Sequence, residues 1–321
     1  MLKSFDENGI QFGWDQTSIK LASECLYKYK LRMLDGWRPR GVSVHLFFGG
    51  VYASALEHFH KHRAAGMDHD EALVAIVREA LIATWLYETE PTGEGDPGYP
   101  NGVNIISGSG APWASDHNTK TRENLIRTIV WYFEHFKEDA CATVILSDGS
   151  AAVEHSFQLP VDNGIIFSGH LDRLVEFGHK IYIQDQKTTA STITPRYFLS
   201  YSPDDQITGM YPFAGRAIFK LPVKGVMIDA AQIAVGFTRF ERGFIFTDDS
   251  ALDEWYDDAL YHIETAQAAT RANHFPKNRT SCHKYAGCEF REVCSKSPHV
   301  REQFLKADFE KAERWDPLQS R

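Results

Sequence analysis

The stretch IIFSGHLDRLVEFGHKIYIQDQKTT, residues 165–189, decides the fold. It holds two segments rich in β-branched and aromatic residues, separated only by Gly178-His179, which predicts two antiparallel strands joined by a two-residue loop. Glycine at the first loop position favours a type II′ turn. With this loop, Phe177 pairs with Lys180, and every further pair lies equally far from the turn on both strands.

This register brings acidic and basic side chains onto one face of the hairpin. Counted outward from the turn, Asp172 lies opposite Asp185, and His170 lies opposite Lys187. Directly opposed residues share a face, and alternation along the strand adds Lys187 to the face of Asp185. Two carboxylates whose Cβ atoms lie about 5 Å apart repel each other, so we expect a cation to compensate them.

The pattern fits metal-assisted hydrolysis of a phosphodiester. Carboxylate oxygens suit Mg²⁺ or Mn²⁺, and such an ion lowers the pKa of its bound water and neutralises phosphate charge. Asp172 and Asp185 are the expected metal ligands, and Lys187 is the amine beside the attacking water or the group under attack. The alternative interpretation is a surface hairpin with solvated charges, because the pattern is short; the strand residues on both sides favour a buried sheet.

The surrounding sequence predicts an α/β fold with a mixed central sheet flanked by helices. Helical spacing of apolar residues predicts six helices: 17–33, 48–65, 69–86, 117–137, 204–219 and 251–273. Thr17 or Ser18 is the expected cap of the first. Alternation predicts further strands over 153–161 and 226–240, and Asn163-Gly164 predicts a hairpin turn after the earlier one.

Two further segments are expected to lie outside this core. The region 88–116 is rich in glycine and proline, which predicts a long loop or insertion. Residues 300–321 are expected to form an amphipathic tail helix whose aromatic side chains pack on the protein body or on a partner.

These residues resemble the PD-(D/E)XK nuclease superfamily, particularly its RecB-like and phage-encoded exonuclease branch. GHLDRL resembles the Gly-x-x-Asp strand, which makes Asp172 the first metal ligand. QDQKTT resembles the D/E-x-K strand, with Asp185 as second ligand and Lys187 as catalytic lysine. Gln206 and Tyr211, in DDQITGMY, resemble the Gln…Tyr motif that lines the DNA groove, at a spacing one residue longer than usual.

The rest of the metal site stays open on the helix side. FGGVYASALEHFHKH, from Phe48, resembles the first core helix of the family, which reads G-x-x-x-H. Ala53 occupies the histidine position. Glu57 lies one turn onward on the same face, and His58 or His60 would need a small rotation; an exposed polar face is the alternative for all three.

A similar choice stays open on the strand that precedes the hairpin. Glu154 resembles a glutamate that the family carries there. Counting through the Asn163-Gly164 turn instead puts His155 opposite Asp172. A slip of one residue exchanges the two side chains.

Four of the five cysteines predict a metal centre. Cys282, Cys288 and Cys294 follow the spacing C-x5-C-x5-C, and Cys25 is the candidate for a fourth soft ligand. Some members of the same nuclease branch carry an iron–sulfur cluster on one N-terminal and three C-terminal cysteines, usually spaced C-x2-C-x5-C, so only the second gap matches here. The resemblance implies a [4Fe–4S] cluster; Zn²⁺, with His283 as a spare ligand, is the rival, and ordinary buried thiols are the third interpretation. Cys141 is expected to be a packing residue.

Composition sets the outer limits. The 321 residues are 43% hydrophobic and 24% charged with a net charge of −9, which is typical of a globular protein and argues against a broad nucleic-acid-coating surface, though not against a local basic channel. No run of eighteen apolar residues occurs, so a membrane span is excluded. The first residues lack the features of a signal peptide, and we expect a cytoplasmic protein.

Taken together, the sequence predicts one nuclease domain over 1–321 with a restriction-endonuclease-like core and chain ends joined by the metal cluster at Cys25 and 282–294. The expected activity is that of a Mg²⁺- or Mn²⁺-dependent deoxyribonuclease, an exonuclease in recombination or repair of DNA ends. Its expected substrates are DNA ends or single strands, and a helicase or recombination protein is the compatible kind of partner. Two alternatives stay open: a catalytically weak DNA-binding or assembly module on the same fold, and a zinc-bound protein-interaction domain.

Overall fold

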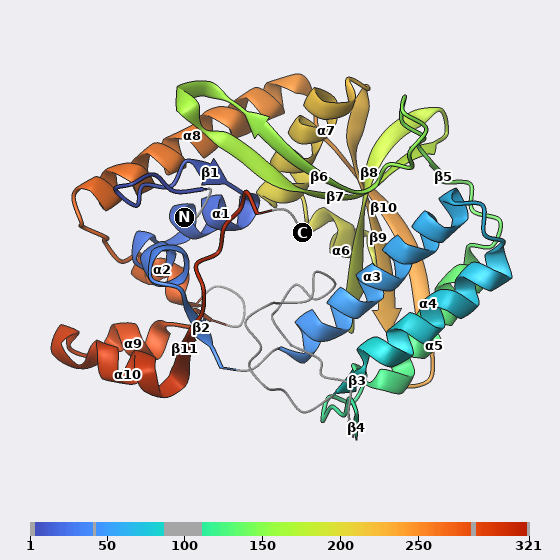
Figure 1. Ribbon diagram of the computed structural model, residues 1–321, viewed down its shortest axis with the longest axis horizontal. Coiled ribbons are helices and arrows are strands. Elements are labelled where there is room, and N and C mark those ends of the chain that lie inside the picture. Colours follow the sequence, from blue (N-terminus) through green and yellow to red (C-terminus); the bar gives the residue numbers. More distant parts are fainter. Residues whose placement is uncertain (1–3, 41–42, 87–110, 284–286, 320–321) are drawn as a thin grey trace. The chain divides into compact units, whose positions relative to one another are not determined.

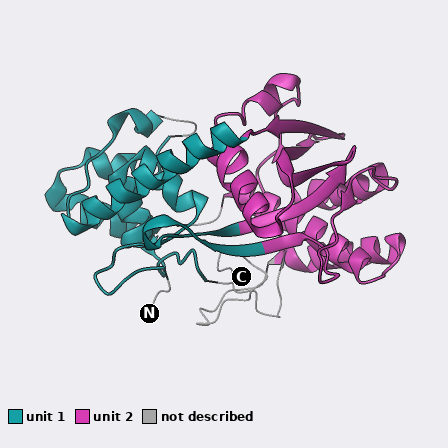
Figure 2. Ribbon diagram, turned by 90° about the horizontal axis from the view of Figure 1, so that it is seen from above, with its two compact units in different colours: residues 1–41, 156–169, 249–320 teal, residues 42–155, 170–248, 321 magenta. Residues whose placement is uncertain are grey.

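The computed structural model describes residues 4–40, 43–86, 111–283 and 287–319. The chain divides into two compact units, each assembled from separate segments (Figure 2). The first unit contains residues 1–41, 156–169 and 249–320, and the second contains residues 42–155 and 170–248.

A mixed sheet of seven strands is the centre of the fold (Figure 1). Five strands follow one another in the order β1 (Gly13–Trp14), β7 (Ile166–Phe177), β8 (Lys180–Thr189), β9 (Val223–Ile233) and β10 (Thr238–Phe246). The strands β5 (Ala142–Thr143) and β6 (Val153–Pro160) also pair with β7. Two of the pairings, β1 with β7 and β8 with β9, are parallel, whereas β7 with β8 and β9 with β10 are antiparallel. The predicted mixed α/β fold is therefore confirmed.

Helices of the second unit pack on both faces of its strands. Three long ones lie side by side in Figure 1: α3 (Val44–Ala64), α4 (His69–Ala83) and α5 (Arg122–His135). Their apolar stripes form one buried cluster that also takes in Ala231 and Ile233 of β9. The shorter α7 (Tyr211–Phe219) approaches β8 so closely that a Cβ on Gly215 would lie 2.8 Å from Ile183. A glycine is needed there because the helix has no room for a side chain.

The first unit joins the two ends of the chain. Its N-terminal part holds α1 (Gln16–Glu24), α2 (Leu26–Tyr29), a π-helical turn (Lys30–Leu34) and β2 (Trp37–Pro39). Its C-terminal part holds α8 (Asp249–Arg271), α9 (Arg291–Ser295), α10 (Arg301–Asp308) and β11 (Phe309–Lys311). β11 pairs with β2, and Leu31 from the N-terminal part shares a small core with Phe290, Val293, Leu305 and Phe309.

Short elements complete the described chain. They are the strand pair β3 (Trp85–Leu86) and β4 (Ala111–Pro112), the helix α6 (Pro195–Leu199), the π-helical turn Gln206–Met210, and the 3-10 turns Asp162–Gly164, Arg279–His283 and Pro298–Val300. Residues 88–110 of the expected loop lie outside the described residues, whereas Ala111 and Pro112 form a strand. None of the described helices is long and apolar enough to cross a membrane.

Several expected elements have other limits in the structure. The helix expected over 17–33 starts after Asp15, whose side chain accepts from the backbone N–H of Ser18, and it breaks at Cys25, where φ is −168° and ψ is 113°. The run 226–240 belongs to two antiparallel strands, not one. The expected tail helix over 300–321 ends at Asp308, because the chain then enters the β11 pairing.

Candidate active site and cysteine cluster

The β7–β8 hairpin has the predicted register and a different turn. Phe177 pairs with Lys180, and pairing continues outward to Arg173 with Gln184. Both loop residues have positive φ, +57° at Gly178 and +60° at His179, which makes the turn type I′ and not the predicted type II′. The two types share the loop length, so the register is unaffected.

The two strands separate just beyond the last pair, at the acidic residues. Asp172 Oδ2 accepts a hydrogen bond of 3.2 Å from the backbone N–H of Gln186. The Asp172 side chain thus takes the place of the next backbone hydrogen bond between β7 and β8. The expected pairing of His170 with Lys187 is therefore absent from the β7–β8 ladder. A strand fork of this kind opens the edge of β8 at Asp185 and Lys187.

Asp185 and Lys187 form a close ion pair at the fork. Asp185 is 1% exposed, and its Oδ2 lies 2.5 Å from Nζ of Lys187, whose side chain is 33% exposed. Apart from this ion pair, Oδ2 accepts no hydrogen bond from any described residue. The lysine thus connects a buried carboxylate with solvent, and it supplies the positive charge that the acids need in the absence of another cation.

The carboxyl groups at the fork have strongly altered acidities. Burial, followed by the charge of Asp185, raises the pKa of Asp172 to about 7. Burial also raises the pKa of Asp185, although Lys187 opposes this effect. For Lys187, burial lowers the pKa, but Asp185 and Asp172 outweigh it and leave the pKa above its usual value. The three groups therefore influence one another's ionisation, although the β7–β8 ladder ends at Arg173 and Gln184, before the predicted pairing of Asp172 with Asp185.

The preceding strand contributes Glu154 to this cluster. The charge of Glu154 raises the pKa of Asp172, whereas the ring of His155 packs 5.0 Å from that of Phe219. Glu154 has a φ of +46°, which interrupts the regular alternation of β6. Glu154 therefore affects the ionisation of Asp172, and its part in metal binding stays a prediction, because no three such side chains of the described residues form a metal site.

On α3, the three candidate ligands have other partners. Glu57 forms an ion pair with Lys61, and His58 Nδ1 lies 2.6 Å from a carboxylate oxygen of Glu79 on α4. The half-buried ring of His60 meets the rings of Phe59 and Phe133 edge-on, and burial together with nearby arginines lowers its pKa well below the usual value. None of these contacts involves the acids at the fork.

Gln206 and Tyr211 contact each other despite their unusual spacing. Gln206 Nε2 donates a hydrogen bond of 2.6 Å to the Tyr211 hydroxyl. Residues 206–210 form a π-helical turn in which the N–H of Tyr211 bonds the carbonyl of Gln206, so residues five apart face each other as residues four apart do on an α-helix. Burial, then the charges of Asp172 and Asp185, raise the pKa of Tyr211, which places its hydroxyl near the acids.

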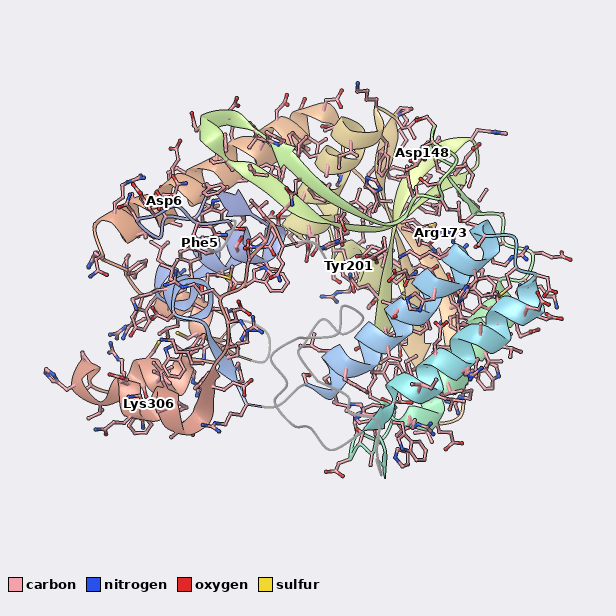
Figure 3. The ribbon with its side chains drawn as sticks, in the orientation of Figure 1. Phe5, Asp6, Asp148, Arg173, Tyr201 and Lys306 are labelled. Carbon is pink, nitrogen blue, oxygen red and sulfur yellow. The ribbon has the colours of Figure 1, made fainter. Side chains whose placement is uncertain are left out.

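Three residues near the fork escaped sequence reasoning. Asp204 adds its charge to Asp185 and Lys187, and the hydroxyls of Tyr197 and Tyr201 lie 3.0 Å apart. Burial raises the pKa of both tyrosines, and Asp185 adds to the effect. Tyr201 is labelled in Figure 3. Thr194-Pro195, the N-cap and first residue of α6, was the signal that could have revealed this short helix.

The opposite face of the same strands is held by a buried polar network. Arg173, labelled in Figure 3, donates 3.0 Å from Nη1 to Gln184, and Gln184 in turn donates to Asp229 on β9. Arg242 on β10 and the hydroxyl of Tyr132 on α5 bind the same Asp229 oxygen at 3.1 and 2.6 Å. This network links β7, β8, β9 and β10, and it fixes the backbone on which the fork sits.

The donor set at the fork has the chemistry of a hard-cation site. It consists of half-buried Asp172 and buried Asp185. Within the described part of the chain, Asp185 Oδ2 contacts only the ammonium group of Lys187, and such carboxylates fit Mg²⁺ or Mn²⁺. Among the described residues, no group of three or more His, Cys, Asp or Glu side chains is arranged to hold a metal ion. The carboxylates at the fork are thus neighbours that an ion could bridge, not a closed ligand shell.

The four cysteines of the predicted metal centre belong to one unit, and their charges affect one another. All four are free thiols of intermediate exposure. Cys288 and Cys294 pack against the core that contains Phe290 and Val293. Burial raises the pKa of the Cys294 thiol, as do, to a smaller extent, Cys288 and Cys25; burial likewise raises that of Cys288, with a smaller contribution from Cys282.

Hydrogen bonds bring the two ends of the chain together at this cysteine cluster (Cys25, Cys282, Cys288 and Cys294). The N–H of Asn278 lies 3.4 Å from Sγ of Cys25, and its side chain donates to the carbonyl of Glu24 at 3.0 Å. The hydroxyl of Ser281 donates to the same carbonyl. Four thiols have the chemistry that an iron–sulfur cluster or Zn²⁺ needs, although no three of these cysteines are arranged as a closed ligand set among the described residues. The fifth cysteine, Cys141, is buried against Val175 and Met227 in the second unit, as a packing residue is.

Comparison with known proteins gives one family. The family model described as PD-(D/E)XK nuclease superfamily matches residues 14–295, which include the acids of the fork, Lys187 and all four cysteines of the cluster. No curated protein matches the chain.

Proposed function

The chain belongs to the PD-(D/E)XK nuclease superfamily, and from this premise we propose that it is a Mg²⁺- or Mn²⁺-dependent deoxyribonuclease that hydrolyses phosphodiester bonds. The observation that carries the proposal is the meeting of Asp172, Asp185 and Lys187 at the fork between β7 and β8. A buried acid pair beside a lysine that reaches solvent is an arrangement suited to binding a cation and a phosphate together.

Each residue at the fork has a defined part in this reaction. Asp172 and Asp185 would hold the ion, which supplies charge neutralisation at the phosphate and a more acidic water. Lys187 keeps its proton at neutral pH because the acids raise its pKa, so it orients the water or a phosphate oxygen as a cation. Gln206, held by Tyr211, would position the DNA strand beside the acids.

The finer assignments follow from the resemblance of the motifs to the RecB-like branch. We propose an exonuclease that acts on DNA ends or single strands in recombination or end processing, with a helicase or recombination protein as partner. The order of motifs along the chain supports this assignment: Cys25 first, then the fork acids, Gln206 and the three C-terminal cysteines.

We also propose that the cysteine cluster binds a [4Fe–4S] centre, with Zn²⁺ as the competing ligand. Its support is the extended backbone at Cys25, which interrupts two helices, and the free thiols gathered in the first unit. A helix break at a ligand position would serve metal binding, because extended backbone gives the sulfur another direction than a continuous helix would.

Substitution of the fork lysine tests the nuclease proposal. Lys187→Met should lower kcat for a labelled linear DNA in Mn²⁺ by about 100-fold or more, as the loss of a group that acts on the reacting atoms does. Binding of the same DNA in Ca²⁺ should change little. Lys180→Met, at the exposed start of β8, is the matched control and should leave cleavage unchanged.

The opposite outcome would favour the other function on this fold. Equal cleavage by the wild type and Lys187→Met would refute the assigned chemistry. A protein that binds DNA with no cleavage in either form would be a DNA-binding or assembly module.

A further inference from the structure

A buried lysine next to the candidate active site has no acidic partner among the described residues. Lys120 is only 2% exposed, and its ammonium donates 2.8 Å to the hydroxyl of Thr188 on β8. It also lies 4.2 Å from the centre of the Phe48 ring. Buried lysines are rare unless paired, and no carboxylate of the described residues forms an ion pair with Lys120.

The neighbouring polar side chains of Thr188 and His117 are not acidic. His117 Nδ1 accepts from the backbone N–H groups of Thr119 and Lys120, at 3.2 and 3.0 Å, so the neutral ring carries its proton on Nε2. The ring of His45 meets that of His117 edge-on at 4.9 Å. Burial lowers the pKa of Lys120 to about 8, and burial, His117 and Lys120 lower the pKa of His45. The site thus lacks negative charge.

The helix beside this site, α3, carries a glycine, Gly49, where a side chain would have room. A Cβ built on Gly49 of α3 would meet only the Thr188 hydroxyl, at 3.8 Å, so packing does not require glycine there. Glycine inside a helix costs about 1 kcal/mol relative to alanine, which makes its presence informative. Space next to a hydroxyl and a buried ammonium is what a tetrahedral anion needs.

The position of Thr188 indicates which anion belongs there. Thr188 follows Lys187 directly in β8, and neighbouring residues of a strand point to opposite faces. An anion on Thr188 would therefore lie close to the fork without occupying it. A nucleic-acid strand is the ligand that would bring several phosphates to this edge of the sheet.

We propose that Lys120 and Thr188, with the space that Gly49 leaves beside them, bind a second phosphate of the DNA strand, next to the one that is hydrolysed. The proposal depends on the deoxyribonuclease function. It adds a binding site on the α3 side of β8, and the phosphate supplies the negative charge that the buried ammonium lacks.

Salt dependence of DNA binding tests this site without cleavage. Binding of labelled single-stranded and duplex oligonucleotides is measured in Ca²⁺ over a range of NaCl concentrations. Lys120→Met should weaken binding about tenfold or more, the scale of one hydrogen bond to a charged group. The slope of log K against log salt should become shallower by about 0.7 for the single strand or 0.9 for the duplex, as loss of one phosphate contact does.

Lys137→Met is the matched control. Lys137 lies just past the other end of α5 and already pairs with Asp70 at 3.5 Å, so its removal should leave the slope unchanged. An identical reduction of the slope in both variants would show a general charge effect and refute the site.

Gly49→Ala tests the site independently of charge and of the fold of the Lys120 variant. The added methyl group fits the free protein at 3.8 Å from Thr188 and should raise its thermal stability, yet it should weaken DNA binding by occupying the anion space. Wild-type binding with an unchanged slope in Lys120→Met, or unchanged binding in Gly49→Ala, would overturn the phosphate site while the nuclease function stands. If the wild type binds neither DNA, the proposed function fails, and the site falls with it.

Discussion

At the scale of single residues, the acid cluster at the fork works against the stability of the metal-free protein. The charges of Asp185 and Glu154 act against ionised Asp172, whereas Lys187 and the hydrogen bond from the backbone N–H of Gln186 favour it. Proteins keep such unfavourable clusters where they bind cations or perform chemistry, because binding then relieves a repulsion that is already present. The cost should be measurable as a dependence of stability on pH.

Asp172→Asn should therefore stabilise the protein in EDTA at pH 8. The pKa of Asp172 is raised to about 7, so its contribution to stability is present below the pKa of the unfolded chain and is lost as pH rises through about 7. The gain in unfolding free energy at pH 8 should be on the order of 1 kcal/mol or more and should shrink towards pH 5. Thermal unfolding across this pH range checks it, with Glu176→Gln, exposed on the same strand, as the control.

Mg²⁺ should reverse the order of the two proteins at pH 8. The wild type gains stability from binding the ion, whereas the variant lacks one ligand. A variant that is less stable than the wild type in EDTA at pH 8 would contradict the repulsion at the fork.

Sequence reasoning at this scale succeeded where geometry is local and failed where it is not. A two-residue loop set the register from Phe177 and Lys180 as far as Arg173 and Gln184; Asp172, Asp185 and Lys187 lie beyond the last pair, and their role as site residues stays a prediction. Tyr197 and Asp204 lie in a separate segment, and only the tertiary fold brings them to Asp185.

At the scale of elements, small departures from regular structure place the site residues. The π-helical turn 206–210 absorbs the extra residue between Gln206 and Tyr211, and a positive φ at Glu154 interrupts β6 at a residue whose charge acts on Asp172. Neither feature leaves a periodic signal in the sequence. The long helices, by contrast, were predictable because their apolar spacing repeats over several turns.

A third departure, a bulge in β9, sets the register of β8 against its parallel neighbour. Ile181 pairs with Val223 and Ile183 with Val226, so β9 holds one extra residue between these pairs. Gly225 lies in this bulge with a φ of +148°, and a Cβ there would lie 2.0 Å from the carbonyl oxygen of Ile245. Only glycine fits this position.

Gly225→Ala should consequently destabilise the protein by roughly 3 kcal/mol or more, through backbone strain and overpacking together. Denaturant unfolding measures the change. Gly236→Ala, in the loop between β9 and β10, would meet nothing within 4 Å and should differ from the wild type by at most about 0.5 kcal/mol. Equal stability of the two variants would mean that the bulge does not constrain the sheet.

At the scale of the whole molecule, the first unit depends on chain ends that are far apart in sequence. Its core around Leu31 and Phe290 is small, and the pairing of β2 with β11 spans only three residues on each strand. The hydrogen bonds of Asn278 and Ser281 to the carbonyl of Glu24 add a few contacts. Bringing together chain segments that are so far apart in sequence costs entropy. A bound metal would therefore contribute strongly to the stability of the unit.

The pattern of cysteines predicted which chain ends meet, although not how. The sequence could not show that Cys25 has an extended backbone between two helices, because the apolar spacing of residues 17–33 continues through it. A ligand position can override helical periodicity, and the break at Cys25 is consistent with that role.

The cysteine cluster gives the last prediction. Anaerobically purified wild type should be brown, with about four iron atoms per chain if the centre is a [4Fe–4S] cluster, and Cys288→Ala should lose the metal. Because the free energy of metal binding becomes free energy of folding, the first unit of the variant should unfold at a lower temperature than that of the wild type. Its free energy of unfolding should fall by more than about 3 kcal/mol. Proteases should then cut first within residues 1–41 or 249–320. Cys141→Ala, buried in the second unit, is the control and should keep its full metal content. A colourless protein with stoichiometric zinc would replace iron by zinc, whereas a wild type without either metal, as stable as Cys288→Ala, would reduce the cluster to ordinary thiols.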